Sequence, residues 1–503
     1  MKVDEYLLKK PFTRISPLAN SLGGYAFSGG EKIAMPNPAA QYYIVSQDDF
    51  LREYDINGHK IWDENFYANR LKSDDNGRTY IHYVERMATN WQEIIVNKQC
   101  LHLCTNPIEF TVVNSDVTDA NELALETFSQ GWEKKNMHVA WTQVVKEAKI
   151  CGDAAVCFYM DEGQIGWKIM TYRNSETLYP QYDRKTGKLS EFARRYKQYD
   201  DTGENLLAEY VDIWDKTYYR QYKRTNSFWT KTKRLFGADG WELIGSGSHG
   251  FPFIPVCYKR EEFGACWSNV QSAIDEYELS TSSLLENNKM TAFRTLFIKG
   301  DMIDPQFDKG GNVNMIVGDK DAEAKWLEKA DVADGFKMAL ENLERNIING
   351  SFIVIPPEVK GSDVSGTTIK LLYSPAIEKA TMDAFDWNLF MDDMVRCFKY
   401  GYGIEISKSM EFNVLDIVGK IVPFVQQSTL ELVTMLGTSV QAGTLSRKTA
   451  ARKNPLGVNY EYQRVEAEKK EGLFDKGGGG VNAAQQAAAG TNVHNNAEQL
   501  AAQ

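Results

Sequence analysis

Three short stretches of this sequence come close to spacings that carry chemistry in proteins, and the first contains two glycines. Gly361 and Gly366 have the spacing of a phosphate-binding loop. Such a loop needs a lysine and then a serine or threonine directly after its second glycine, because these side chains reach the phosphates and the magnesium ion. Thr367 and Thr368 occupy those positions instead. The sequence therefore argues against ATP hydrolysis at this segment.

The second stretch is a glycine-rich run from Gly245 to Gly250 that resembles a nucleotide-binding loop. A loop of that kind opens a helix, since the helix N-terminus attracts phosphate. Here Phe251 and Pro252 follow and lead into a strand-like segment. We therefore expect a turn rather than a nucleotide site. The pattern Gly-x-Ser-x-Gly does not occur, so the sequence also lacks the nucleophile elbow of serine hydrolases.

The third stretch holds two cysteines and a histidine. On a strand, Cys100, His102 and Cys104 would share one face, which is the nearest approach in this sequence to a metal-binding cluster. No His-x3-His or Cys-x2-Cys pair supplies the remaining ligands of a zinc site. We therefore interpret these side chains as core packing. The seven cysteines are expected to be reduced, buried thiols of a cytosolic protein.

Four aspartates, Asp383, Asp386, Asp392 and Asp393, lie close together in the sequence of a predicted helix. Neighbouring carboxylates can hold a divalent cation. We interpret these four instead as the polar side of the helix or as part of a subunit interface. The sequence thus predicts no catalytic residue, no metal and no cofactor.

The totals bound the remaining possibilities. The chain has 503 residues, 43% hydrophobic and 25% charged, which is ordinary for a globular protein and enough for about two to four structural regions. The net charge of -11 argues against a broad basic face for nucleic acid. No apolar stretch is long enough for a membrane-spanning helix, and the first residues lack the apolar core of a secretory signal.

Apolar periodicity places the candidate loop between two helices. A shorter helix is predicted over 331–349, ahead of an apolar segment that closes on Pro356 and Pro357. A small polar loop follows. Ser365 or Thr367 can cap the next helix, because a side-chain oxygen there accepts from a free backbone N–H. Apolar side chains then recur at steps of three and four along a long helix, at Ile369, Leu372, Ala376, Ala380, Ala384, Trp387, Met391, Met394 and Phe398.

Two residues set the expected shape of this long helix. Pro375 lies inside the predicted helix, where it removes one backbone hydrogen bond and clashes with the preceding turn. We therefore expect a kink at Pro375. Gly401 is expected to end the helix.

The rest of the chain predicts mixed helices and strands. Helices are expected over 47–54, 80–97, 119–135, 139–150, 267–288 and 463–474, with a mostly helical stretch at 417–436. Strands are expected over 108–113, 154–160, 165–171, 189–199, 209–214, 218–224, 241–245, 253–258, 292–299, 314–317 and 405–413. Ser446 is expected to cap a short helix, and the glycine-rich stretch from Gly477 onward to be a low-complexity tail.

The order of a helix, a loop and a long kinked helix resembles the portal proteins of tailed bacteriophages. In that family the loop carries the pattern Ser-Gly-x-x-x-Lys, which here runs from Ser365 to Lys370. A second run of residues is similar to the family: a glycine after a helix, a β-hairpin, a Pro-x-Tyr-Asp step and an Arg-x-Tyr strand. These residues are Gly152, Pro180, Tyr182, Asp183, Arg194 and Tyr196. The resemblance covers residues from about 75 to about 470.

The resemblance implies an α+β portal fold with wing, helical stem, clip and crown regions around a central channel. The wing is expected at 1–262 with a long kinked helix at 367–404, and the stem helices at 263–292 and 331–350. The remaining regions are the clip at 293–330, the channel loop at 351–366, the crown at 405–475 and a disordered tail at 476–503.

The resemblance also implies a function without catalysis. Family members assemble as a closed ring, twelve subunits in the virion, as head-to-tail interfaces do when the rotation closes. The ring would form in the host cytoplasm, sit at one capsid vertex, and be the channel for genome packaging and ejection. The implied partners are double-stranded DNA, the terminase large subunit, a head-completion adaptor, and the major capsid and scaffolding proteins, with no membrane. The packaging ATPase would be a separate protein.

The resemblance assigns the DNA channel loop to Lys360, Gly361, Ser362, Asp363, Ser365, Gly366 and Lys370. Glycines and small polar residues permit close approach to DNA. Lys360 and Lys370 would make few, sequence-independent and salt-sensitive phosphate contacts. An acidic chain is compatible with this role, because tight phosphate contacts would slow DNA that must slide. The alternative for Lys360 is that it only solvates the loop.

Two other interpretations stay open on the sequence alone. One is a metal-dependent hydrolase or nuclease associated with phage DNA, which a turnover assay with magnesium or manganese would reveal. The other is a scaffold or capsid protein of a different kind. A glycine loop followed by a long proline-containing helix argues against a scaffold or capsid protein of a different kind.

Overall fold

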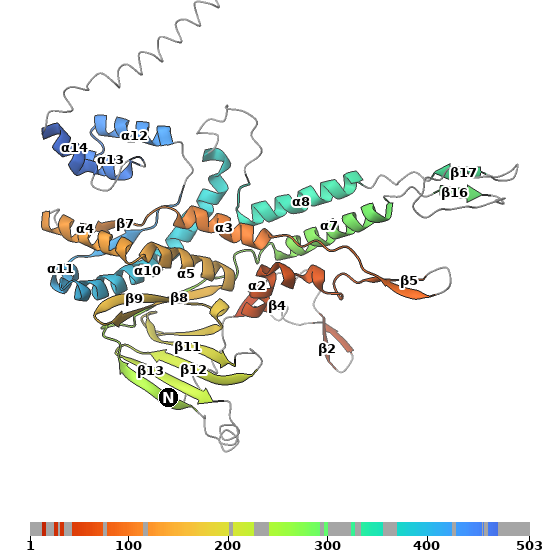
Figure 1. Ribbon diagram of the computed structural model, residues 1–503, viewed down its shortest axis with the longest axis horizontal. Helices are drawn as coiled ribbons and strands as arrows, with labels where there is room; N and C mark the ends of the chain where they lie inside the picture. Colours follow the sequence, from red (N-terminus) through yellow and green to blue (C-terminus); the bar gives the residue numbers. More distant parts are fainter. Residues whose placement is uncertain are drawn as a thin grey trace, which may run out of the picture. The chain divides into compact units, whose positions relative to one another are not determined.

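A computed structural model describes residues 13–16, 25–28, 31–34, 43–73, 78–113, 119–200, 205–225, 241–291, 296–299, 323–326, 333–355, 370–424, 429–454, 456 and 461–470 (Figure 1). The chain divides into two compact units. Unit 1 comprises Met1–Pro357 and Tyr373–Phe424, and unit 2 comprises Glu358–Leu372 and Val425–Gln503. Helices and antiparallel strand pairs both build unit 1, in agreement with the predicted α+β class.

The core of unit 1 lies among four helices and a small sheet. The helices are α3 (Trp91–Cys104), α4 (Asp119–Lys134), α5 (Met137–Cys151) and α10 (Ser374–Glu405). Their buried aromatic rings meet edge to face. The ring centres of Trp141 in α5 and Trp387 in α10 are 5.3 Å apart, and those of Phe128 in α4 and Phe398 in α10 are 5.5 Å apart. Burying side chains of this size stabilises the fold by about 2 kcal/mol each. The long helix α10 is therefore a central element of the core.

Two antiparallel sheets follow α5 in the chain. The first has the order β15 (Val256–Arg260), β8 (Asp153–Asp161) and β9 (Gln164–Met170), and it packs on α5 and α10. The second has the order β10 (Glu176–Tyr182), β11 (Leu189–Tyr199), β12 (Leu206–Trp214), β13 (Tyr218–Thr225) and β14 (Glu242–Ser248). The strand predicted over 189–199 coincides with β11.

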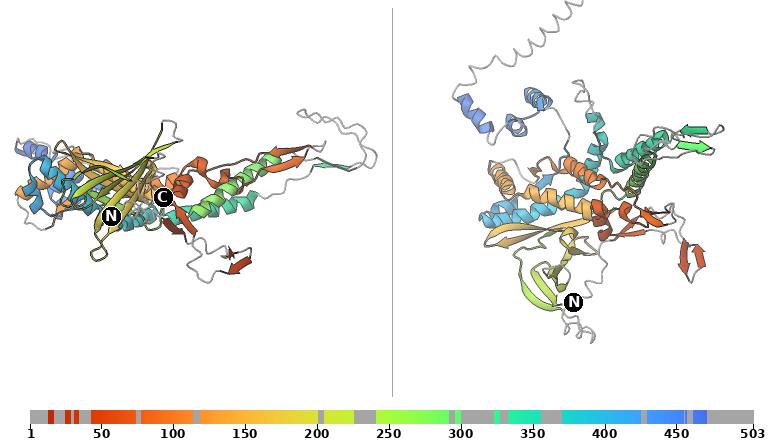
Figure 2. Two further views of the ribbon diagram at one scale, coloured as in Figure 1. Left: turned by 90° about the horizontal axis from the view of Figure 1, so that it is seen from below. Right: turned by 45° about the vertical axis from the view of Figure 1, so that its right-hand side comes forward.

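The helices α7 (Gln271–Thr291) and α8 (Ala333–Ser351) lie side by side, as both views in Figure 2 show. Between them in sequence, β16 (Leu296–Lys299) pairs with β17 (Glu323–Trp326). The predicted strand at 314–317 lies outside the described residues.

The remaining elements are short. At the N-terminus, β1 (Thr13–Ser16) pairs with β4 (Tyr43–Ser46), β2 (Tyr25–Ser28) with β3 (Glu31–Ala34), and β5 (Arg70–Ser73) with β6 (Thr79–His82). The predicted helix at 47–54 is confirmed as α2 (Gln47–Tyr54), and two single turns follow, η3 (Ile56–Gly58) and η4 (Lys60–Trp62). Unit 2 contains α12 (Thr429–Gln441), α13 (Arg447–Lys453) and α14 (Glu461–Lys470). Ser446 caps α13 as predicted, since its hydroxyl accepts from the Thr449 N–H at 3.1 Å.

The helix predicted over 80–97 is wrong in its position. β6 ends at His82, and α3 begins only at Trp91 and continues to Cys104. The backbone between them donates to side chains of α7 instead of forming helical hydrogen bonds. Met87 N–H donates to Ser282 at 2.9 Å and Thr89 N–H to Glu278 at 2.7 Å. Contacts from distant residues thus override the local apolar period.

The cysteine-histidine stretch lies on α3, and the strand assumed for it is wrong. On a helix, Cys100 and Cys104 share a face, whereas His102 points elsewhere. Its Nδ1 lies 3.0 Å from the Phe424 carbonyl oxygen. Both thiols are buried, in agreement with the interpretation as core packing.

Three further predictions are wrong. The segment at 405–413 is not a strand, because α10 continues to Glu405 and α11 (Ser409–Val414) is helical. The segment at 417–436 opens with β18 (Ile417–Lys420), which pairs with β7 (Glu109–Val112), so its carbonyls and N–H groups bond across strands. The expected turn at 245–250 is mostly strand, because β14 extends to Ser248.

Gly401 lies within α10 and does not end it. A Cβ at this position would lie 2.4 Å from Cδ1 and 3.0 Å from Cγ1 of Ile165 in β9. The glycine therefore allows the helix to approach the sheet closely. Close packing against Ile165 therefore explains why a glycine is present at position 401, and helix termination does not.

Replacing Gly401 with alanine is expected to lower the free energy of unfolding by about 1 kcal/mol. Alanine gains about 1 kcal/mol in helix propensity, but forcing a methyl group against Ile165 costs about 1–3 kcal/mol. Chemical denaturation measures the difference. Ile165→Val removes the Cδ1 atom, so the double variant should recover part of the loss. Gly335→Ala in α8, where a Cβ meets open space, is the matched control and should not destabilise. A Gly401→Ala protein as stable as that control would contradict the close approach.

Candidate functional site

Most of the predicted channel-loop residues lie outside the described residues: Lys360, Gly361, Ser362, Asp363, Ser365 and Gly366. Lys370 is described, and it is helical together with Leu371 and Leu372. The structure therefore describes the two ends of the segment that carries the loop. The ends that lie in unit 1 are the chain after α8 and the start of α10.

The first end is a helix terminus that is closed by its own backbone. The Ser351 hydroxyl donates to the Ile347 carbonyl oxygen at 2.6 Å. Phe352 has a φ of 56°, and the Ile353 N–H donates to the Ile348 carbonyl oxygen at 3.2 Å. A left-handed residue followed by this hydrogen bond is the Schellman ending of a helix. Ile353 and Val354 are then buried, so the chain leaves α8 in a fixed direction.

The second end is the start of α10. Tyr373 is a buried turn residue, α10 begins at Ser374, and Pro375 lies in its first turn. Proline is tolerated there because the N–H it lacks would have no helical partner. Pro375 is thus at the beginning of α10, and a kink at this residue stays a prediction.

A chain of polar contacts joins the two ends, and we call it the anchor network. Gln99 of α3 donates through Nε2 to the Ser351 carbonyl oxygen at 2.9 Å. Lys149 of α5 donates to Gln99 Oε1 at 3.1 Å and to Asp383 Oδ2 at 2.7 Å. Lys379 reaches the other oxygen of Asp383 at 2.6 Å. The end of α8 and the third turn of α10 are therefore held to the same two helices.

The electrostatics of the anchor network keep it ionised. Burial alone would lower the pKa of Lys149, but the negative charge of Asp383 outweighs it and raises this pKa. Burial likewise acts to raise the pKa of Asp383, and the two lysines outweigh it and lower this pKa. Lys149 is 1% exposed, so water does not screen the pair. Both groups are charged at neutral pH.

A small pocket lies between the two ends. Its lining residues are Lys98, Gln99, His102, Phe352, Ile353, Ala376, Lys379, Ala380 and Asp383. The Nδ1 atom of His102 donates to the Phe424 carbonyl oxygen, and within the described residues its buried Nε2 has no partner. Burial raises the pKa of Cys100, which follows Gln99 on α3, to about 11, so no thiolate is available. The arrangement positions chain segments, and its described groups form no nucleophile and base pair.

The four candidate aspartates do not converge. Asp383 is buried in the anchor network, so its placement on a polar outer side is wrong. Asp386 pairs with Lys259 at 2.5 Å, Asp393 with Arg396 at 2.7 Å, and Asp392 is exposed. Among the residues that the structure describes, no group of three or more histidine, cysteine, aspartate or glutamate side chains could hold a metal ion.

The second run of family-like residues has structural roles. Gly152 ends α5 with a φ of 81°, and its N–H donates to the Ala148 carbonyl oxygen. Arg194 is buried between Asp212 and Glu176, and Tyr196 stacks on Tyr210 at 5.1 Å between ring centres. These contacts join β10, β11 and β12 on one face of the sheet. Pro180 and Tyr182 lie on β10, and Asp183 begins the turn after it.

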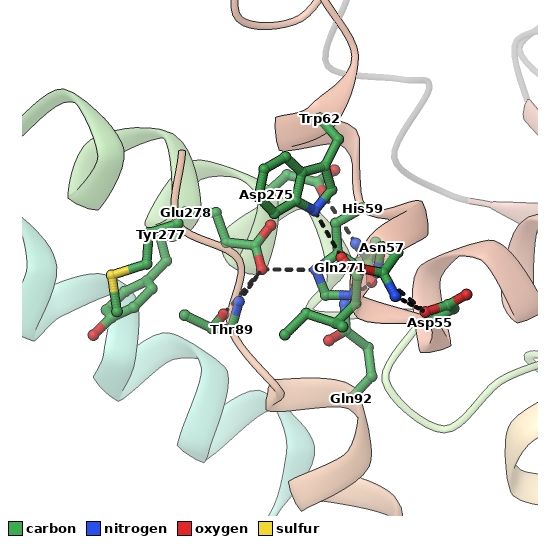
Figure 3. Close-up of polar contacts among 12 residues, drawn as sticks. Asp55, Asn57, His59, Trp62, Thr89, Gln92, Gln271, Asp275, Tyr277 and Glu278 are labelled. Atoms are coloured by element: carbon green, nitrogen blue, oxygen red, sulfur yellow. Dashed lines mark hydrogen bonds and ion pairs between the residues drawn. The ribbon is translucent and has the colours of Figure 1, made fainter. Parts of the chain in front are cut away.

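A second polar cluster, which the sequence did not predict, joins the N-terminal part of the chain to α7; we call it the N-terminal clasp, and Figure 3 shows the part around His59 and Glu278. Residues at 59–60 and 82–89 contact polar side chains of α7. His59 Nδ1 lies 2.8 Å from Glu278 Oε1, which also accepts from the N–H and hydroxyl of Thr89. Lys60 pairs with Asp275 at 2.6 Å, and further along α7 His82 lies 2.6 Å from Glu286. The signal in the sequence was the set of carboxylates on one side of a predicted helix.

Comparison with known families gives one clear result. The profile of the phage portal proteins of the SPP1 Gp6-like type matches residues 48–472 of the 503. The chain belongs to the phage portal protein family. No curated protein gives a significant match. In the described part of the chain, no helix combines the length and the apolarity that crossing a membrane requires.

Proposed function

We propose that this chain is the portal subunit that forms a ring at one capsid vertex, through which the phage genome is packaged and ejected. The match to the portal family over 48–472 carries the proposal. The ring would be the docking platform for the terminase large subunit and a head-completion adaptor, with twelve subunits in the virion. It would form in the host cytoplasm beside the major capsid and scaffolding proteins.

The proposed regions keep the boundaries that the family resemblance implies. Residues 1–262 and 367–404 are the wing, 263–292 and 331–350 the stem, 293–330 the clip, 405–475 the crown and 476–503 the tail. The side-by-side packing of α7 and α8, with the strand pair β16–β17 between them in sequence, supports a stem that carries a clip. The three consecutive helices of unit 2 support a separate crown from Val425 onward, whereas 405–424 lie in unit 1.

The proposed mechanism is positioning without catalysis. The anchor network holds Ser351 before the loop and Asp383 after it, and this would give the channel loop a fixed base. Lys360 and Lys370 would meet DNA phosphates in few contacts that carry no sequence information. The described carboxylates give no support to the alternative of a metal-dependent nuclease.

The proposal is tested by negative-stain electron microscopy and mass photometry on one purified sample. Rings with a central hole and a mass near twelve or thirteen subunits are expected. A monodisperse monomer or dimer over a range of salt and protein concentrations would contradict the portal assignment. Turnover of DNA in the presence of magnesium or manganese would favour the nuclease.

Replacing Lys360 with alanine is expected to reduce DNA retention in filled heads while rings still assemble. Removing one phosphate contact per subunit weakens a salt-dependent interaction that the ring repeats. Retention is measured by nuclease-protected DNA per head at several salt concentrations. Lys185→Ala, in the turn between β10 and β11, is the control and should leave retention unchanged. Impaired ring assembly, with unchanged DNA retention in the heads that do assemble, would show that the loop is wrongly assigned.

A further inference from the structure

The outer face of α10 carries an apolar stripe. Met382 is 67% exposed, Phe385 68% and Leu389 78%. Their spacing of three and four residues aligns them on one side of the helix. Three large apolar side chains exposed in a row mark a contact surface, because monomeric proteins seldom leave such a patch uncovered. We call these residues the α10 stripe.

The α10 stripe faces away from the core of unit 1. Asp383, Ala384 and Trp387 of the same helix are buried against α3, α5 and the small sheet. Residues two positions apart on a helix, such as Asp383 and Phe385, point in nearly opposite directions. The described residues of unit 1 therefore pack on one side of α10 and leave the stripe on the other.

A second exposed apolar surface lies on α3. Ile94 is 38% exposed and Leu101 43%, and their spacing places them on the outer side of the helix with Lys98 between them. Phe352, which is 46% exposed, lines the same pocket as Lys98 and so extends this surface beyond α3. We call Ile94, Lys98, Leu101 and Phe352 the α3 patch.

The two surfaces have complementary charge. Glu378 and Asp392 are exposed and continue the α10 stripe by helical steps of four and three at its two ends. Neither has a cationic partner among the described residues, and Lys98 has no anionic partner among them. Packing the α10 stripe on itself would bring these carboxylates against one another, which is unfavourable. Lys98 of the α3 patch can pair with one of these carboxylates, whereas the stripe packed on itself meets only like charge.

We propose that the α10 stripe of one chain packs on the α3 patch of a second copy. The proposal rests on the proposed function, because it names the contact that builds the ring. Two different surfaces on one chain make a head-to-tail interface, which repeats around an axis and closes when the rotation allows. Aromatic and apolar side chains at the centre of such a contact carry most of its stability.

Two charge variants test the contact in the full-length chain. Phe385→Glu disrupts the stripe and Leu101→Glu disrupts the patch, and both positions are exposed, so folding should not change. Each variant alone is expected to associate at least about tenfold more weakly and to give monomers by mass photometry where the parent chain gives rings. An equimolar mixture is expected to give dimers without rings, because only one intact stripe and one intact patch can meet. Val414→Glu, at an 84% exposed residue of α11, is the control and should still form rings.

Each other outcome is decisive. Rings from either single variant, or only monomers from the mixture, would overturn the proposed pairing while leaving the portal function in place. Monomers from the parent chain would contradict the portal function first. A photoreactive residue at position 385 supplies an independent readout, since it should crosslink between chains to the peptide that contains Leu101. Crosslinks to any other surface, or to a different protein only, would overturn the proposal.

Discussion

Replacing Lys149 with methionine is expected to lower the free energy of unfolding by about 3 kcal/mol. Removing one partner of a buried ion pair leaves the other charge uncompensated, which typically costs about 3–5 kcal/mol. The lower end applies here because Lys379 still reaches Asp383. The change also leaves Gln99 Oε1 without its donor. Urea unfolding followed by tryptophan fluorescence measures the loss, since Trp141 and Trp387 are fully buried in the same core.

Two further variants separate the ion pair from simple packing. Lys379→Met removes the other cation, whose side chain is 34% exposed, and should cost no more than about 1 kcal/mol. The double variant Lys149→Met with Asp383→Leu should recover most of the loss, because an apolar pair of similar volume replaces the charges. Equal losses from the two lysine variants would show that the pair does not dominate. A double variant as unstable as Lys149→Met would assign the loss to packing.

The local elements that the sequence predicts well are those with a strong period of their own. The alternating residues of β11 and the two central helices α4 and α5 have the predicted type and nearly the predicted ends. Short-range patterns determine these elements because their own backbone or an adjacent strand satisfies their hydrogen bonds.

The segments that the sequence predicts wrongly are held by distant residues. The stretch after β6 has a helical period, but Ser282 and Glu278 on α7 accept its N–H groups about 190 residues away. The anchor network has the same character, because Lys149 and Asp383 are 234 residues apart in the chain. No local pattern in a single sequence predicts that Lys149 and Asp383 form a pair. The one available sign was a lysine among apolar residues on the buried side of α5.

The N-terminal clasp is expected to loosen as the pH rises above about 6.5, the ordinary pKa of histidine. His59 and Glu278 are both almost fully buried at the contact. Burial alone would lower the pKa of His59, but its hydrogen bond to Glu278 and the charge of that carboxylate raise it. A raised pKa in the folded state means that the folded chain binds the proton more tightly. The contribution of protonated His59 to the stability of the clasp is therefore complete below about pH 6.5. It is lost as the pH rises through the pKa of His59 in the folded chain.

Other titratable groups near His59 also change the stability of the clasp with pH, each in a direction that its pKa shift determines. Burial raises the pKa of Glu53, which accepts from Trp267, to about 7, so its contribution also falls as the pH rises. The hydrogen bond from His82 lowers the pKa of Glu286, so that contribution is lost only in acid. Lys60 and Asp275 form an ion pair beside His59. The difference between the parent chain and a His59 variant isolates the histidine.

Limited proteolysis of the segment 59–89 at graded pH measures the loosening directly. Cleavage in the parent chain should become faster above pH 6.5, by about tenfold for each unit by which the folded pKa of His59 exceeds its ordinary value. His59→Gln should remove the histidine part of this dependence, and Glu278→Gln should reduce it by removing the charge that raises the pKa. Exposed loops elsewhere supply the internal control, because their cleavage depends on the protease alone. A His59→Gln chain with the parent pH profile would show that His59 is not the group that titrates.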